Sequence, residues 1–237
     1  MDMTLPFRIG LAERQDFPAY PASRSVPPEP VTLPWGLKPL GSAECGAERL
    51  SDGRLSYWIR HDTVKGVTPR MLVWWFSHLE GDVEIAGQRI NRYRAWHPYD
   101  HVHARYVRRR PDGSIGPGAA IRLREFLGAD PRFDVDVVTD IEQLDETGYV
   151  HNPRVHGLPG LVRMEYRFTR VADGTLYQNR ILIGGAQGWR RTVLPLVERF
   201  AFDQAHGRAW LRHNVEEVGA FEHFLPALYR SETGLGT

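Results

Sequence analysis

RAWLRHNVEEVGAFEHFLPAL, at residues 208–228, has the apolar spacing of a long amphipathic helix. The helical pattern begins at about residue 194 and continues to about residue 228. The segments before it have the shorter period that is typical of strands. The sequence therefore predicts that a run of strands is followed by one long C-terminal helix.

The clearest strand before this helix is LVRMEYRFTRV, at residues 161–171, because its apolar and polar side chains alternate. One face of this strand is expected to carry Val162, Met164, Tyr166 and Phe168. The dipeptide Asp173-Gly174 then favours a tight turn, and residues 175–185 form a second apolar segment. Together these segments predict an antiparallel hairpin.

A short apolar helix is predicted upstream, with Thr68 as its N-cap, Pro69 in its first turn and Gly81 after its end. Residues 92–101 are expected to be irregular because Pro98 interrupts them, and residues 141–148 to form a polar loop. Further strands are predicted at residues 101–109, 119–128 and 131–141, a turn followed by a strand at residues 51–62, and a strand or hairpin at residues 82–90. This order favours an α+β helix-grip fold, in which a curved antiparallel sheet encloses a pocket against the long helix.

The chain has 237 residues, which favours a single domain with an extension. Proline-rich residues 1–45 are predicted to form an N-terminal arm, and residues 46–237 to form the helix-grip domain. An arm of this kind could wrap a partner subunit, so a homodimer is possible. We expect a cytoplasmic protein, because no segment resembles a membrane span or a secretion signal.

Charge and cysteine content exclude several classes of site. The net charge is +1, which argues against a nucleic-acid or membrane partner. Cys45 is the only cysteine, so the chain can form neither an internal disulfide nor a cysteine metal cluster. Any metal ion would have to be bound by histidine and carboxylate side chains.

The long helix carries the sharpest functional pattern. At 100° per residue, one arc holds Trp210, His213, Glu217, Phe221 and Phe224. The opposite side holds Arg208, Arg212, Glu216, Gly219 and His223. His213 and Glu217 are one turn apart, so both could bind one metal ion. The alternative is a simple hydrogen-bonded pair at the edge of the helix.

WHPYDHVH, at residues 96–103, is the second pattern. His101 and His103 are two residues apart on a predicted strand and should share a face, whereas His97 precedes a proline. Glu125 continues the inward alternation of Ile121 and Leu123, which is the pattern of a buried acid. The candidate metal-binding set is His101, Glu125, His213 and Glu217, and two imidazoles with two carboxylates suit zinc better than magnesium or calcium. Whether His97 or His103 replaces His101 is left open.

Three segments make the sequence resemble the 2,4-diacetylphloroglucinol hydrolase and phloretin hydrolase family: MLVWWFSHL, RYRAWHPYDH and HNVEEVGAFEHFLPALY. The resemblance implies a helix-grip fold of the START and birch-pollen-allergen type. It also implies that His101, Glu125, His213 and Glu217 bind zinc. A tyrosine that binds the ring hydroxyls would correspond to Tyr93, and a pocket histidine to His156 or, alternatively, His151. Ala104 departs from the family pattern, which has a polar residue there.

The resemblance implies a zinc-dependent hydrolase that cleaves the carbon–carbon bond between an acyl group and a phenolic ring, or a bond in a related diketone. The expected partner is therefore a small aromatic ketone substrate. Tyr93 and His156 would be catalytic, and Trp74, Trp210 and Phe221 would line the substrate pocket. Two other classes stay open: a non-catalytic helix-grip protein that binds a hydrophobic small molecule, and a metal-free polyketide cyclase or isomerase.

Overall fold

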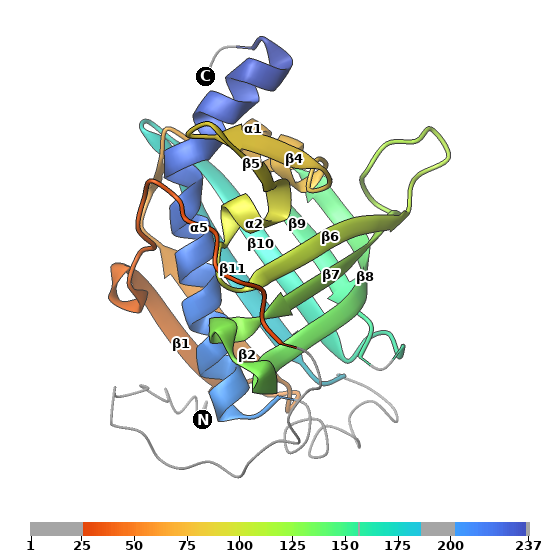
Figure 1. Cartoon of the computed structure of the whole chain (residues 1–237). Coiled ribbons are helices and arrows are strands. Elements are labelled where there is room, and N and C mark those ends of the chain that lie inside the picture. Colours follow the sequence, from red (N-terminus) through yellow and green to blue (C-terminus); the bar gives the residue numbers. More distant parts are fainter. Residues whose placement is uncertain (1–25, 156, 186–201, 236–237) are drawn as a thin grey trace.

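In the computed structural model, which describes residues 26–155, 157–185 and 202–235, one strongly curved antiparallel sheet surrounds a long helix (Figure 1). The sheet has nine strands within these residues. Their order is β1 (Ala43–Arg49), β2 (Leu55–His61), β11 (Gly174–Ile183), β10 (Val162–Val171), β9 (Gly148–Pro153), β8 (Asp134–Asp145), β7 (Ala120–Phe126) and β6 (His101–Arg108), while β3 (Val64–Lys65) pairs with β11. The predicted α+β helix-grip fold is confirmed.

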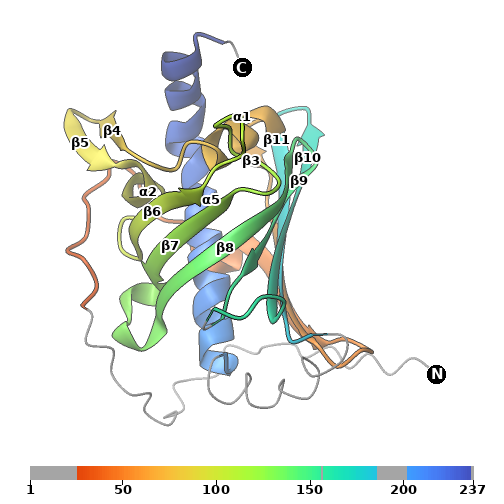
Figure 2. The same cartoon turned by 90° about the vertical axis from the view of Figure 1, so that its right-hand side faces the viewer.

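The long helix is α5 (Gln204–Thr233), which lies in the concave side of the sheet (Figures 1 and 2). The Asp203 side chain caps its N-terminus by accepting a hydrogen bond from the His206 amide. Gly234, in the left-handed conformation, ends the helix. Residues 194–201, where the sequence also predicts helix, lie outside the described part of the chain.

The β10–β11 hairpin forms as predicted, and Val162, Tyr166 and Phe168 are buried on one face. Strand β8 runs on to Asp145 through the segment predicted as a loop, because antiparallel pairing with β9 satisfies its backbone groups there. Short 3₁₀ turns, η1 (Leu40–Ser42), η2 (Leu127–Ala129) and η3 (Pro131–Phe133), complete the connections.

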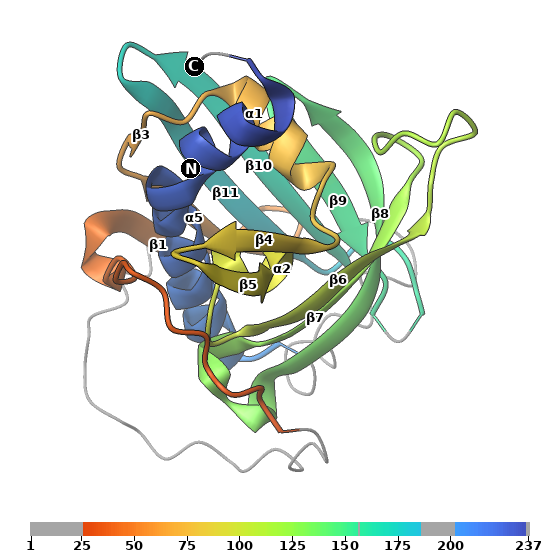
Figure 3. The same ribbon diagram turned by 45° about the horizontal axis from the view of Figure 1, so that its top comes forward.

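Two short helices and a two-stranded hairpin cover one end of the sheet (Figure 3). Helix α1 (Pro69–Phe76) begins at the predicted Thr68 cap but ends at Ser77, whose hydroxyl donates to helix carbonyls, rather than at Gly81. Strands β4 (Asp82–Ile85) and β5 (Gln88–Asn91) form a hairpin. The segment predicted to be irregular forms a short helix, α2 (Arg92–Trp96), because Pro98 lies after its end and the Asn91 side chain caps its start.

Helix α5 is covered on its second side too, by the segment that leads into β1. The Trp35 ring stacks on His223 and Phe224, and the Lys38 side chain lies against Gly219. Glu216, expected on the outer side, is only 7% exposed. The helix is therefore largely buried all round through its middle, which holds its side chains in fixed positions.

Replacing Gly207 with alanine is expected to destabilise the protein by about 1–3 kcal/mol. An added Cβ would lie 2.2 Å from Cε1 of the buried Tyr57 ring, so this close contact between α5 and β2 would have to open. Urea unfolding would measure the loss. The exposed control Ala227→Gly should cost about 1 kcal/mol, and a more stable Gly207→Ala protein would contradict the prediction.

Candidate metal centre

Two of the predicted ligands come from neighbouring strands at the edge of the sheet. His101 begins β6, and Glu125 lies directly opposite it on β7. A β-bulge follows His101 and places His103 opposite Arg124, the residue before Glu125. Consecutive strand residues point to opposite faces, so His103 does not share the face of His101. The expectation that the two histidines share a face was wrong, and the bulge is the reason.

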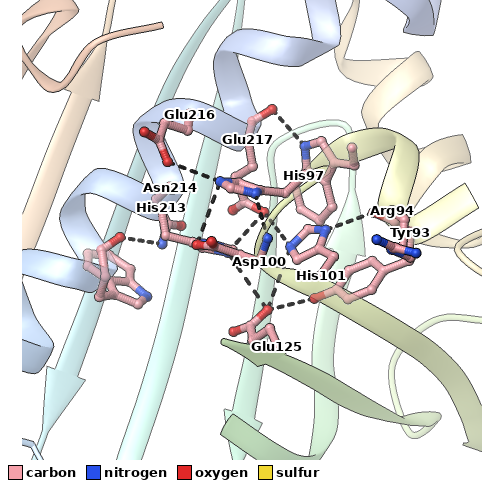
Figure 4. Close-up of polar contacts among 12 residues, drawn as sticks. Tyr93, Arg94, His97, Asp100, His101, Glu125, His213, Asn214, Glu216 and Glu217 are labelled. Carbon is pink, nitrogen blue, oxygen red and sulfur yellow. Dashed lines mark hydrogen bonds and ion pairs between the residues drawn. The ribbon is translucent and has the colours of Figure 1, made fainter. Parts of the chain in front are cut away.

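The other two predicted ligands lie one turn apart on α5, facing these strands (Figure 4). His101 Nε2 lies 3.4 Å from Glu217 Oε2 and 3.6 Å from Glu125 Oε2. His213 Nε2 lies 3.6 Å from Glu217 Oε2 and 3.7 Å from Glu125 Oε2. Four ligands in a tetrahedron with bonds of 2.0–2.2 Å would be about 3.3–3.6 Å apart. The four histidine–carboxylate distances are close to this spacing, and the ligand atoms of His101, His213 and Glu217 all lie within 4.8 Å of one another.

Hydrogen bonds on the far side of each imidazole fix which nitrogen faces this point. His101 Nδ1 donates to the Tyr93 carbonyl at 2.8 Å, and His213 Nδ1 donates to Asp100 Oδ2 at 2.8 Å. His101 Nε2 is buried and has no hydrogen-bond partner among the described residues. Both rings therefore direct Nε2 at the carboxylates, and a metal ion requires this arrangement with Nε2 deprotonated.

The electrostatics of the group also favour a cation. Burial, together with the charges of Glu125 and Asp100, raises the pKa of Glu217 well above its usual value. Burial lowers the pKa of His213, but the charges of Glu217 and Glu125 and the hydrogen bond to Asp100 outweigh this and raise it to about 10. A buried group with this excess of negative charge is stabilised by a proton or a metal ion. The residues present therefore fit a divalent metal.

Behind the two histidines lies a buried polar network that the sequence did not predict. The Gly128 and Ala129 amides, each at 2.8 Å, donate to the Asp100 carboxylate. His97, stacked on the His213 ring at 4.8 Å, has Nε2 3.1 Å from Glu216 Oε2. His97 thus lies on the Asp100 and Glu216 side of His213, and its ligand atom is within 4.8 Å of those of Asp100 and His213. Asp100 directly precedes His101 in the sequence. This adjacency was the one sequence feature that could have indicated that Asp100 lies near the candidate ligands.

A cavity of about 560 Å³ lies between the sheet and α5 and reaches this group. Glu125, His213 and Glu217 are in its wall. Tyr93 also lines it, and its hydroxyl donates to Glu125 Oε2 at 2.7 Å. The predicted pocket between sheet and helix is present, and three of the four candidate ligands line it.

The structure places the predicted pocket residues differently. Trp210 lines the cavity, but Trp74 and Phe221 are not among the described residues around it. Trp74 packs against His78 and Tyr229 away from the cavity. Phe221, fully buried, belongs to the aromatic core one turn beyond Glu217. Helical spacing predicted the correct face for Phe221. It could not predict that the cavity ends at Glu217, one turn before Phe221.

The two candidate histidines in the middle of the chain have different outcomes. His156 lies outside the described residues. His151 lies on β9, is 2% exposed and lines the cavity beside Tyr149 and Tyr166. Its Nδ1 is 2.6 Å from the Thr139 hydroxyl, and its Nε2 is 3.5 Å from the Tyr166 hydroxyl. Of these two histidines, His151 is the one among the described residues, and it lines the cavity.

Comparison with known families finds a match in the first half of the chain, where the first candidate ligand lies. Residues 38–117, which include Tyr93 and His101, match the family model described as the DAPG hydrolase PhiG domain. The resemblance to the DAPG hydrolase family is thereby confirmed. The match indicates a hydrolase, and the remaining candidate ligands, Glu125, His213 and Glu217, lie beyond the matched residues.

Solved structures with similar chain paths have little sequence in common with this protein. Ara h 8.0201 is 11% identical, with a TM-score of 0.46 over 74% of this chain and 99% of that one. A START superfamily protein from Mycobacterium smegmatis is 13% identical, with a TM-score of 0.40 over 69% and 97%. The search of curated proteins finds no match. Among the described residues, no helix has the length and apolar character needed to cross a membrane.

Proposed function

We propose that this protein is a zinc-dependent hydrolase that cleaves the carbon–carbon bond between an acyl group and a phenolic ring. The observation that carries the proposal is the convergence of His101, Glu125, His213 and Glu217, three of which line a cavity with aromatic side chains in its wall. The family match supports the same class of reaction. Zinc suits two imidazoles and two carboxylates better than an oxygen-preferring cation does.

The proposed reaction adds water across the bond: the acyl carbon gains the hydroxyl and leaves as a carboxylic acid, while the ring carbon gains the proton. Bound zinc would act as a Lewis acid that polarises the acyl oxygen and activates water at neutral pH. The ring is a poor leaving group until a ring hydroxyl becomes a ketone and the acyl-bearing carbon becomes tetrahedral. The protein must therefore hold the ring hydroxyls and deliver a proton to that carbon.

We assign these tasks to Tyr93 and His151. Burial and the nearby Glu125 and Glu217 raise the pKa of Tyr93 well above its usual value, so its hydroxyl stays protonated and can donate. Burial lowers the pKa of His151 to about 3, so the ring is neutral near pH 7. A neutral imidazole has one donor and one acceptor nitrogen and can pass a proton between a ring hydroxyl and the ring carbon. Tyr166, beside Nε2 of His151, would complete the hydroxyl-binding wall.

The proposal predicts about one zinc ion per chain in the purified protein. Removal of the metal with a chelator should abolish hydrolysis of acylphloroglucinols, and added zinc should restore it. Elemental analysis and product chromatography would measure the two effects. A folded protein without metal that binds aromatic ketones unchanged would instead favour a non-catalytic binding protein, and a rearranged product would favour a cyclase or isomerase.

A further inference from the structure

The cavity has two ends that differ in chemistry. Beside Glu217 it is lined by hydroxyl and imidazole groups from Tyr93, Tyr149, His151 and Tyr166. Towards the start of α5 its wall includes the polar side chains of Arg132, Asp134 and His206, but most of it is apolar: Leu127, Val155, Val162, Ile181, Phe202 and Trp210. These six also belong to one apolar cluster, separate from the aromatic core around α1. Three of the candidate metal ligands, Glu125, His213 and Glu217, are in the same wall.

The cavity as a whole is long. On α5 the cavity is lined by His206, Trp210, His213, Asn214 and Glu217, so it follows the helix for about 16 Å, at 1.5 Å per residue. Beyond Glu217 the helix contributes core residues such as Phe221 instead. The cavity therefore extends from the metal ligands towards the start of α5, over about three turns.

The cavity is also larger than a small acylphenol needs. A cavity of about 150 Å³ accommodates one benzene ring, whereas the volume here is about 560 Å³. A phenolic ring with an acetyl group would leave most of the apolar end to water. Apolar walls in contact with water are costly at about 25 cal/mol per Å², so a ligand that covers them binds more tightly.

We propose that the substrate carries an extended apolar acyl chain, which lies along α5 in the cavity end formed by Val162, Ile181 and Trp210. This inference rests on the proposed function and names the substrate class of the same site. The ring hydroxyls pair with the polar end, because an apolar wall would leave them without hydrogen bonds. The acyl carbonyl then lies at the candidate metal ligands, and the chain points towards Phe202.

A series of straight-chain acylphloroglucinols, from acetyl to decanoyl, tests the inference. The value of kcat/KM should rise about two- to fourfold per added methylene until the chain fills the cavity. Octanoylphloroglucinol should therefore exceed acetylphloroglucinol by about 50-fold or more. A flat profile, or one with its maximum at acetyl, would overturn the inference while leaving the proposed hydrolase reaction intact.

Val162→Phe shortens the apolar end and supplies a second test. This variant should lower the ratio of kcat/KM for the octanoyl substrate to kcat/KM for the acetyl substrate from about 50 or more to a few-fold. The matched control is Leu176→Phe, because Leu176 is 41% exposed on β11 and does not line the cavity. Equal losses on both substrates in a folded Val162→Phe protein would contradict the assignment of the chain to this end.

Binding of alkylphloroglucinols, which lack the carbonyl and cannot be hydrolysed, separates the two proposals. Calorimetry should give a dissociation constant that falls with chain length in the wild-type protein and much less in Val162→Phe. If no acylphenol is hydrolysed but this trend holds, the proposed function fails and the apolar subsite stands. If the dissociation constant is independent of chain length, the subsite is excluded, whether or not hydrolysis occurs.

Discussion

Replacing Glu217 with glutamine is expected to lower acylphenol hydrolysis by at least about 100-fold. Glu217 Oε2 lies within 3.6 Å of Nε2 of both His101 and His213, so it is central to the candidate metal group. Glutamine keeps the size of the side chain but removes the charge that would bind the ion. Steady-state kinetics, with the zinc content measured on the same samples, would give the effect.

Glu217→Gln should stabilise the metal-free protein. It should destabilise the metal-loaded protein relative to the wild type. Burial raises the pKa of Glu217 well above its usual value. A carboxyl group of this kind stabilises the fold while it is protonated, and this contribution is lost as the pH rises through the raised pKa. Glutamine never ionises, so metal-free Glu217→Gln should unfold at a higher temperature than the metal-free wild type at pH 8. Added zinc should raise the melting temperature of the wild type far more.

Glu222→Gln is the matched control, because Glu222 lies on α5 but pairs with Lys38 and the Lys65 amide. It should keep both zinc and activity. Full zinc content and full activity in Glu217→Gln would remove Glu217 from the site. Loss of activity with normal zinc content would instead assign Glu217 a role in the reaction rather than in binding the metal.

The fold could be predicted largely from local patterns. Alternation in residues 161–171, the turn at Asp173-Gly174 and the apolar arc of the last helix depend on neighbouring residues alone, and these elements form as expected. The predictions were wrong where tertiary contacts, rather than the local pattern, decide the structure or burial of a residue. Residues 141–145 are polar, yet pairing with β9 makes them a strand. Glu216 faces away from the sheet, yet contacts with His97 and Arg212 bury it.

Three of the four candidate ligands could be identified from the sequence because each interrupts an apolar pattern. Glu125 stands in an inward-facing alternation, and His213 and Glu217 stand in an aromatic arc. The supporting residues give no such signal. Asp100 acts through the Gly128 and Ala129 amides, which fold back from η2, and that contact cannot be inferred from spacing. Whether the four residues bind zinc stays a prediction, as does the proposed homodimer.

Replacing Asp100 with asparagine is expected to weaken zinc binding by about 10- to 100-fold. Asp100 is 1% exposed and accepts hydrogen bonds from three donors: His213 Nδ1, the Gly128 amide and the Ala129 amide. An asparagine side chain has one acceptor oxygen, so its amino group would face a donor. The His213 ring would lose the partner that fixes its orientation and that increases the basicity of Nε2.

A coloured chelator that competes for zinc would measure the affinity independently of catalysis, and a cobalt-substituted sample would report the ligand geometry through its visible spectrum. Asp112→Asn is the control, because Asp112 lies in an exposed turn and pairs only with nearby groups. Its affinity should equal that of the wild type. If Asp100→Asn folds normally and binds zinc with unchanged affinity and an unchanged cobalt spectrum, His213 does not need Asp100 to present Nε2. The polar network behind the ligands would then serve the packing of α5 against η2 rather than the metal.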